Sequence, residues 1–135
     1  MSIRVLIVDH HEQIRRLVRA FLLIEFGFQI CGEAVDGWEA IKKAQLLKPD
    51  LIILELALPR LNGVEAAPKL RKLLPKIRII LFTLHGGLLK GVDTRDIGDA
   101  VVAKQDGMSA LGNSVRILFR QQSGRALGPS AQLKF

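Results

Sequence analysis

The chain has 135 residues, a size that fits a single domain. Hydrophobic residues make up 49% and charged residues 24%, which excludes a disordered or collagen-like chain. The formal net charge is +7, from 20 Lys and Arg against 13 Asp and Glu. No apolar run approaches the roughly 20 residues of a membrane span, and the single cysteine, Cys31, excludes an internal disulfide and a cysteine-based zinc site. We therefore expect a soluble, cytoplasmic domain.

The first part of the chain alternates apolar runs with helical patterns. Residues 3–8 (IRVLIV) are typical of a buried strand, and residues 11–26 carry apolar side chains at the spacing of one helix face. A second strand is predicted over 28–34. Asp36 and Glu39 stand at capping-box spacing, which predicts that a helix opens there.

The same alternation continues in the middle of the chain. Residues 51–54 (LIIL) predict a third buried strand, and residues 77–82 (IRIILF) predict a fourth. Between them, Asn62 and Glu65 repeat the capping spacing and open a helix that runs to about Leu74.

The last part of the chain holds weaker signals. Residues 84–98 predict a short helix, weakened by four glycines that each cost about 1 kcal/mol relative to alanine inside a helix. A fifth strand is predicted over 100–103 and a last helix over 108–119. The polar residues 121–135 are expected to be a flexible tail.

Five β/α units of this kind predict an α/β fold. Strands that are apolar throughout belong to a parallel sheet covered by helices on both faces. Right-handed crossovers then lead to a doubly wound five-stranded sheet flanked by five helices. Ligand sites in such sheets lie at the carboxyl ends of the strands, so the residues that follow each apolar run are the candidates for function.

Polar side chains follow four of the five predicted strands. Asp9 and His10 come after the first strand, Glu55 after the third, Thr83 after the fourth and Lys104 after the fifth. Two carboxylates, a hydroxyl and an ammonium group at one edge of a sheet form a pocket suited to an oxyanion, with or without a divalent cation.

The motifs VLIVD, LIILELALPRLNG, ILFT and VVAK, in this order, resemble those of response-regulator receiver domains, the CheY-like modules of two-component signalling. The resemblance runs from about residue 3 to residue 119. It implies a flavodoxin-like sheet with strand order 2-1-3-4-5. It also implies that residues 1–120 form the receiver domain, followed by the tail.

The resemblance assigns roles to the strand-end residues. In receiver domains two adjacent acids after the first strand hold magnesium, and an aspartate after the third strand accepts a phosphoryl group from a sensor histidine kinase. A hydroxyl side chain and a lysine after the fourth and fifth strands bind the phosphoryl oxygens. By position, Asp9 matches the first acid, and Thr83 and Lys104 match the phosphoryl-oxygen ligands. Pro59 and Gly63 match the loop after the phosphoacceptor.

Two central positions depart from the family pattern. His10 replaces the second acid, and imidazole is a poor ligand for magnesium, so we expect a degenerate metal site in which Asp9 and Glu55 bind Mg²⁺ weakly at best. Glu55 occupies the phosphoacceptor position with one extra methylene. A nucleophile displaced by about 1 Å can lose on the order of a hundredfold in rate. Leu84 and Val101 also differ from the small and aromatic residues usual in the family switch.

Other clusters favour simpler interpretations. The histidines at positions 10, 11 and 85 lack zinc-site spacing, so solvated or helix-capping side chains are expected. The basic run over residues 69–78 is expected to be a solvated helix face. The alternative interpretation is a docking surface for an acidic partner. No helix-turn-helix fits after Phe119, and no phosphate-loop, dinucleotide or nucleophile-elbow motif is present, so neither nucleic-acid binding nor an enzyme is expected.

These observations predict a stand-alone receiver domain that requires no cofactor and signals by protein–protein contact. With Glu55 at the acceptor position, it acts either as a mimic of the phosphorylated state or as an inert pseudo-receiver. A phosphorylatable receiver with an altered site and a basic regulator associated with nucleic acid remain as alternatives. Expected partners are a sensor histidine kinase or a downstream signalling protein. A homodimer through the fourth helix, fifth strand and fifth helix is also expected, because the last helix is rich in apolar residues: Val115, Ile117, Leu118 and Phe119.

Overall fold

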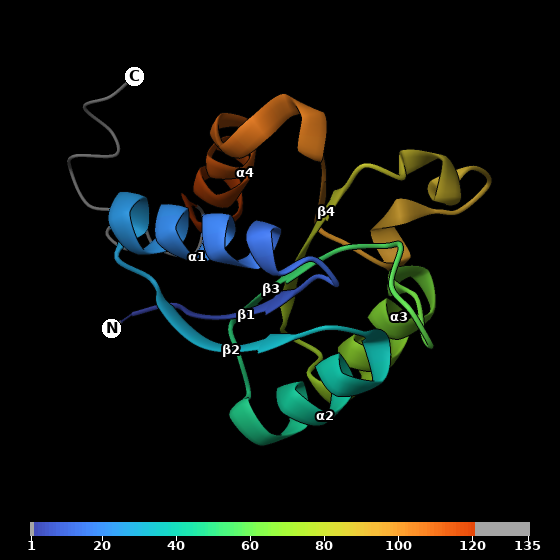
Figure 1. Cartoon of the computed structure of the whole chain (residues 1–135). Helices are drawn as coiled ribbons and strands as arrows, with labels where there is room; N and C mark the ends of the chain where they lie inside the picture. Colours follow the sequence, from blue (N-terminus) through green and yellow to red (C-terminus); the bar gives the residue numbers. More distant parts are fainter. Residues whose placement is uncertain (1, 121–135) are drawn as a thin grey trace.

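The computed structural model describes residues 2–120, so Met1 and the predicted tail over 121–135 lie outside the described residues (Figure 1). Five parallel strands form one sheet in the order β2-β1-β3-β4-β5, which confirms the predicted α/β topology. The strands are β1 (Arg4–Val8), β2 (Gln29–Ala34), β3 (Leu51–Leu54), β4 (Arg78–Thr83) and β5 (Ala100–Ala103).

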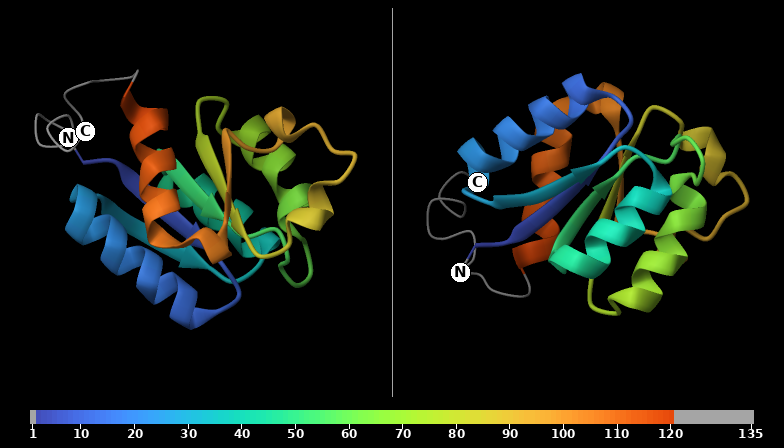
Figure 2. Two further views of the ribbon diagram at one scale, coloured as in Figure 1. Left: turned by 90° about the horizontal axis from the view of Figure 1, so that it is seen from above. Right: turned by 60° about the horizontal axis from the view of Figure 1, so that its bottom comes forward.

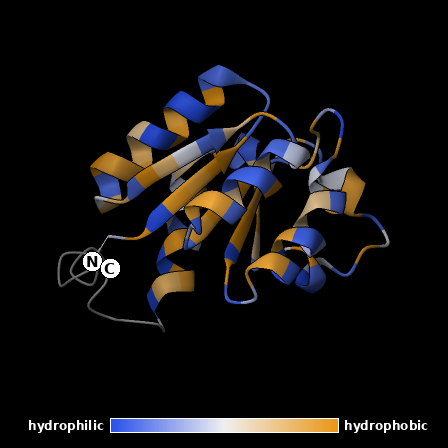
Figure 3. Cartoon of the chain, turned by 90° about the horizontal axis from the view of Figure 1, so that it is seen from below, coloured by the Kyte–Doolittle hydropathy of each residue, from blue (hydrophilic) through white to orange (hydrophobic). Residues whose placement is uncertain are grey.

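Helices cover both faces of the sheet, with α1 and α4 on one face and α2 and α3 on the other (Figures 1 and 2). Their bounds are α1 (Glu12–Phe26), α2 (Gly37–Leu47), α3 (Gly63–Leu73) and α4 (Gly107–Arg120). Each face has its own apolar core, and the strands supply alternate side chains to the two cores, as the pleat requires. Figure 3 shows the result, with largely hydrophobic strands between helices of mixed character.

Two of the helices begin where the capping patterns predict. Asp36 caps α2 by accepting a hydrogen bond from the Glu39 N–H at 2.8 Å. Asn62 and Glu65 form a complete capping box at the start of α3. These caps satisfy backbone donors that a helix start otherwise leaves without partners.

The predicted helix over 84–98 is wrong. The segment forms two short 3₁₀ turns, η1 (Gly86–Leu89) and η2 (Thr94–Asp96), so the described residues contain four α-helices and not five. Gly91 adopts a left-handed φ of 78°, which interrupts any helix at that point. No residue from Leu84 to Asp96 is fully buried, so packing does not compensate for the low helix propensity of the glycines.

The last helix exposes less apolar surface than its composition indicates. Val115 and Phe119 are buried in the core between α4 and the sheet, and Leu118 packs against the same core. Ile117 remains 65% exposed. The apolar argument for a dimer interface on this helix therefore rests on one side chain and not on four.

No helix in the described residues is long and apolar enough to cross a membrane.

Candidate functional site

Four side chains meet at the carboxyl end of the sheet. Asp9 follows β1, Glu55 follows β3, Thr83 ends β4 and Lys104 follows β5. Asp9, Glu55 and Thr83 are only 2–3% exposed, and the Lys104 side chain is 6% exposed. Strands from distant parts of the sequence thus deliver two acids, a hydroxyl and an ammonium group to one buried spot, as predicted from the strand ends.

Lys104 is the centre of this cluster. Its Nζ donates a hydrogen bond to Asp9 Oδ2 at 2.5 Å and another to Glu55 Oε1 at 2.7 Å. Glu55 and Lys104 are therefore in direct contact. Asp9 uses its other oxygen, Oδ1, to accept the His11 N–H at 2.8 Å, and the His11 ring nitrogen Nδ1 lies 3.3 Å from the same atom.

The Glu55 carboxylate is surrounded by donors. While Oε1 accepts from Lys104, Oε2 accepts the backbone N–H groups of Leu56 at 2.5 Å and Ala57 at 3.1 Å. Burial raises the pKa of Glu55, but hydrogen bonds from Lys104, the Thr83 hydroxyl and the Ala57 N–H together lower that pKa below its ordinary value. Glu55 is consequently an ionised carboxylate held in a buried oxyanion-binding site.

The loop after Glu55 is shaped by a close backbone approach. A Cβ on Gly63 would overlap the Glu55 carbonyl oxygen and would lie 2.8 Å from the Leu56 Cα, so only glycine fits. The Gly63 N–H donates to the Leu56 carbonyl at 2.8 Å and closes the loop. Gly63 thereby allows the start of α3 to pack directly against the site.

The other end of this loop is fixed by an ion pair that sequence reasoning missed. The Arg60 guanidinium contacts Asp36 Oδ2 at 2.5 and 2.8 Å, and Arg60 takes a left-handed φ of 64°. Hydrogen bonds from the Glu39 N–H and from Arg60 lower the pKa of the buried Asp36 carboxyl, although burial opposes them. Asp36 was recognisable as a helix cap, but no sequence signal paired it with Arg60.

A second missed residue supports the site from α1. Arg15 Nη1 donates to the Asp9 backbone carbonyl at 2.8 Å, while its Nε pairs with Glu33 Oε1 on β2 at 2.8 Å. Arg19 contacts the other oxygen of Glu33. This chain of contacts connects Asp9 to the edge strand, and its members are too far apart in sequence to be linked by spacing.

The two carboxylates that would bind a magnesium ion are paired with Lys104 in this structure. Magnesium requires hard oxygen ligands in near-octahedral geometry, and Asp9 Oδ2 and Glu55 Oε1 both accept from the Lys104 ammonium group. His10 is exposed, and no group of three or more His, Cys, Asp or Glu side chains within residues 2–120 could hold a metal ion. A weak magnesium site formed by Asp9 and Glu55 stays a prediction.

The remaining expectations concern the surroundings of the site. Leu84 is 58% exposed and Val101 is 45% exposed, so neither side chain fills the pocket. Thr83 Oγ1 accepts the His85 N–H at 2.8 Å. The basic run over 69–78 is not uniformly free, because Arg71 pairs with Asp99 at 2.9 Å.

Comparison with known proteins agrees with this architecture. The family described as "Response regulator receiver domain" matches residues 5–115. The response regulator protein VraR of Staphylococcus aureus (strain Mu3) is 34% identical over an alignment of 137 positions, gaps included, which covers 90% of this chain and 66% of VraR. The chain thus spans just under two thirds of the length of that relative.

Solved structures show the same fold. A two-component response regulator of the LuxR family from Aurantimonas sp. SI85-9A1 has a TM-score of 0.79 at 25% identity, covering 90% of this chain and 87% of that one. The response regulator domain of Thermotoga maritima CheB has a TM-score of 0.73 at 27% identity, with coverages of 89% and 93%. A CheY-like receiver domain from Methanospirillum hungatei reaches a TM-score of 0.81 at 24% identity, with coverages of 90% and 97%, a likeness of fold.

The family match spans most of the chain, and the four buried polar side chains stand at the strand ends where receiver motifs are found. The chain therefore belongs to the response regulator receiver domain family of two-component signalling.

Proposed function

We propose that Glu55 takes the place of a phosphorylated acceptor in this receiver domain, and that the domain signals by protein–protein contact and catalyses no reaction. The observation that carries the proposal is the set of donors around the Glu55 carboxylate: the Lys104 ammonium group and the backbone N–H groups of Leu56 and Ala57. By family resemblance, Thr83 and Lys104 are the groups that bind phosphoryl oxygens. In this chain Lys104 donates to the Glu55 carboxylate instead.

The same contacts argue against phosphoryl transfer to Glu55. A nucleophilic carboxylate needs an oxygen free to approach the phosphorus in line, and each Glu55 oxygen already accepts at least one hydrogen bond. The Lys104 ammonium group also contacts the two carboxylates that would bind a magnesium ion. Attack would therefore require the central ion pairs to open.

Mimicry and inertness remain two forms of this proposal. A carboxylate carries one negative charge on two oxygens, whereas a phosphoryl group carries about 1.5 to 2 charges and three acceptor oxygens. The contact of Glu55 with Lys104 favours the mimic, because by family resemblance this lysine would hold the phosphoryl group in a phosphorylated receiver. In the inert form the domain is a pseudo-receiver that partners recognise through its surface alone.

An NMR comparison separates the two forms. The double variant His10→Asp, Glu55→Asp restores the family's acids, and beryllofluoride with magnesium supplies a phosphoryl analogue that it can bind. We expect the backbone amides of Thr83, His85 and Lys104 in the wild type to resonate near their positions in the beryllofluoride-bound variant. Resonances near those of the unliganded variant would eliminate the mimic and leave the pseudo-receiver.

The partners follow from the family. Response regulators act with sensor histidine kinases and downstream signalling proteins, and we propose that one of these recognises the domain in its Glu55-filled state. Self-association belongs to the same proposal. Of the predicted face, the fourth helix is replaced by the 3₁₀ turns η1 and η2, while the fifth strand and fifth helix are β5 and α4, with Val101 and Ile117 as their exposed apolar side chains.

A further inference from the structure

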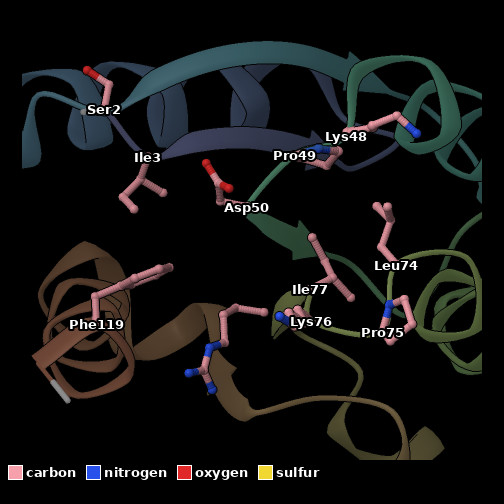
Figure 4. A pocket seen from close by; sticks show the side chains of 11 residues that line it. Ser2, Ile3, Lys48, Pro49, Asp50, Leu74, Pro75, Lys76, Ile77 and Phe119 are labelled. Carbon is pink, nitrogen blue, oxygen red and sulfur yellow. The ribbon is translucent and has the colours of Figure 1, made fainter. Parts of the chain in front are cut away.

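A cavity lies at the opposite end of the sheet from Glu55. It has a volume of about 530 Å³ and opens beside the amino ends of β1, β3 and β4, between the ends of α3 and α4 (Figure 4). Small-molecule sites typically measure about 300–1,000 Å³, so the cavity is large enough for a ligand of ten or so non-hydrogen atoms. The phosphoryl-binding residues contribute nothing to its lining.

The interior of this cavity is apolar. Ile3 just before β1, Leu74 and Ile77 in the loop between α3 and β4, and Phe119 on α4 line it together (Figure 4). Ile77 and Phe119 belong to the packed core, being 4% and 1% exposed, so this part of the wall is rigid. Ile3 and Leu74 are only partly buried, so they offer the apolar surface that a ligand body would cover.

The rim of the cavity is cationic. Lys48, Lys76 and Arg78 line it, and Asp50 is the one acidic residue among the lining side chains. The Asp50 carboxylate is partly committed, because its Oδ2 accepts the Arg4 N–H at 2.9 Å. Lys76 and Arg78 are the last two residues of the basic run over 69–78. The lining thus combines an apolar floor with a net charge of +2.

We propose that this cavity binds a small amphipathic anion, with a compact hydrocarbon body and a single carboxylate or similar group. The body would lie against Ile3 and Leu74, over the buried Ile77 and Phe119, and the anionic group would lie at the rim near Lys76. A neutral ligand of the same shape would gain only the apolar contacts. A cationic one would meet like charge, so the sign of the ligand charge decides affinity.

Charge also argues against the nearest alternative occupant. The described residues end at Arg120, one residue after Phe119, and residues 121–135 follow in the sequence. Those 15 residues include Arg125 and Lys134 but no Asp or Glu. A segment that brings two further cations is a poorer match for this rim than a small anion is.

The test uses three probes with one hydrocarbon chain: octanoate, octanol and octylamine. Each is titrated into the full chain while backbone amide resonances are followed. We expect octanoate to shift the amides of Ile3, Asp50, Lys76 and Ile77, with octanol about threefold or more weaker and octylamine weaker still. Equal shifts from all three probes, or shifts centred on other elements, would overturn the proposal.

Two substitutions sharpen the test, and both lie on exposed side chains. Lys76→Glu should weaken octanoate binding by about three- to tenfold, because it reverses one rim charge. Asp50→Asn should tighten octanoate binding while its amide oxygen still accepts from Arg4. Lys72→Glu, the same change on an exposed residue of α3 outside the cavity, should have little effect. If Lys72→Glu weakens binding as much as Lys76→Glu does, only the overall charge matters and the site is refuted.

A third arm tests the chain's own segment. The contrary outcome is that octanoate leaves the cavity amides of the wild type unshifted, while the substitutions Leu133→Ser and Phe135→Ser together move those amides relative to the wild type in the absence of any probe. In that case the segment after Arg120 occupies the cavity and the proposal fails.

Discussion

Replacing Lys104 by methionine tests how the buried charges are balanced. In the wild type one ammonium group serves two carboxylates, Asp9 and Glu55, and all three side chains are at most 6% exposed. Lys104→Met keeps an unbranched side chain but leaves two buried carboxylates without their cation. Removing one partner of a buried ion pair costs about 3–5 kcal/mol, so we expect a loss of that size in the free energy of unfolding at neutral pH.

The effect of Glu55→Gln on the free energy of unfolding should be destabilising in the wild type and stabilising in Lys104→Met. In the wild type, glutamine loses a charge-assisted hydrogen bond from Lys104 or turns its amide N–H₂ toward the backbone donors of Leu56 and Ala57, at a cost of about 1–3 kcal/mol. In Lys104→Met, the same change removes one of two uncompensated charges and should restore about 1–2 kcal/mol.

Urea unfolding of the four proteins of this cycle, at one pH and salt concentration, measures both effects. Lys69→Met is the matched control, since Lys69 is exposed on α3, and it should change the free energy of unfolding by less than about 0.5 kcal/mol. A Glu55→Gln penalty that is equal in the two backgrounds, within about 0.5 kcal/mol, would refute the coupling of Glu55 to Lys104.

Three further outcomes are expected. Hydrogen exchange should be on the order of tenfold or more faster for the amides of residues 86–96 than for the central turns of the four α-helices, because these 3₁₀ turns bury little, and equal protection would count against it. His10→Asp should strengthen magnesium binding measured by calorimetry, since it adds a carboxylate beside Asp9, and a tight magnesium site in the wild type would contradict this expectation. Sedimentation should show concentration-dependent self-association that Ile117→Lys weakens, and a monomer at high concentration would dispose of the dimer.

Much of the fold could be predicted because the central strands are continuous apolar runs in the sequence. Runs such as LIIL at 51–54 are buried on both faces, and the residues that end them must then lie together at one edge of a parallel sheet. The sequence alone therefore predicts that Asp9, Glu55, Thr83 and Lys104 lie in one pocket. The edge strand β2 is only partly buried and follows the same pattern less clearly.

The errors and omissions have physical causes. Residues 84–98 contain enough apolar side chains to suggest a helix, but their packing is too slight to offset four glycines, and sequence periodicity does not report packing. The Arg15 contact with the Asp9 carbonyl and the Arg60 pair with Asp36 join residues through space, without a spacing that identifies them. Likewise, four apolar residues on the last helix predict an apolar dimer interface, whereas two of them, Val115 and Phe119, are buried in the core.

Mass spectrometry after incubation with a small acyl-phosphate donor and magnesium tests most directly whether Glu55 replaces phosphorylation. The wild type is compared with the double variant His10→Asp, Glu55→Asp, which shows that the donor and conditions are competent. The donors around Glu55 predict that the double variant gains the mass of one phosphoryl group at position 55 and that the wild type gains none. A phosphoryl group found on Glu55 of the wild type would contradict the account.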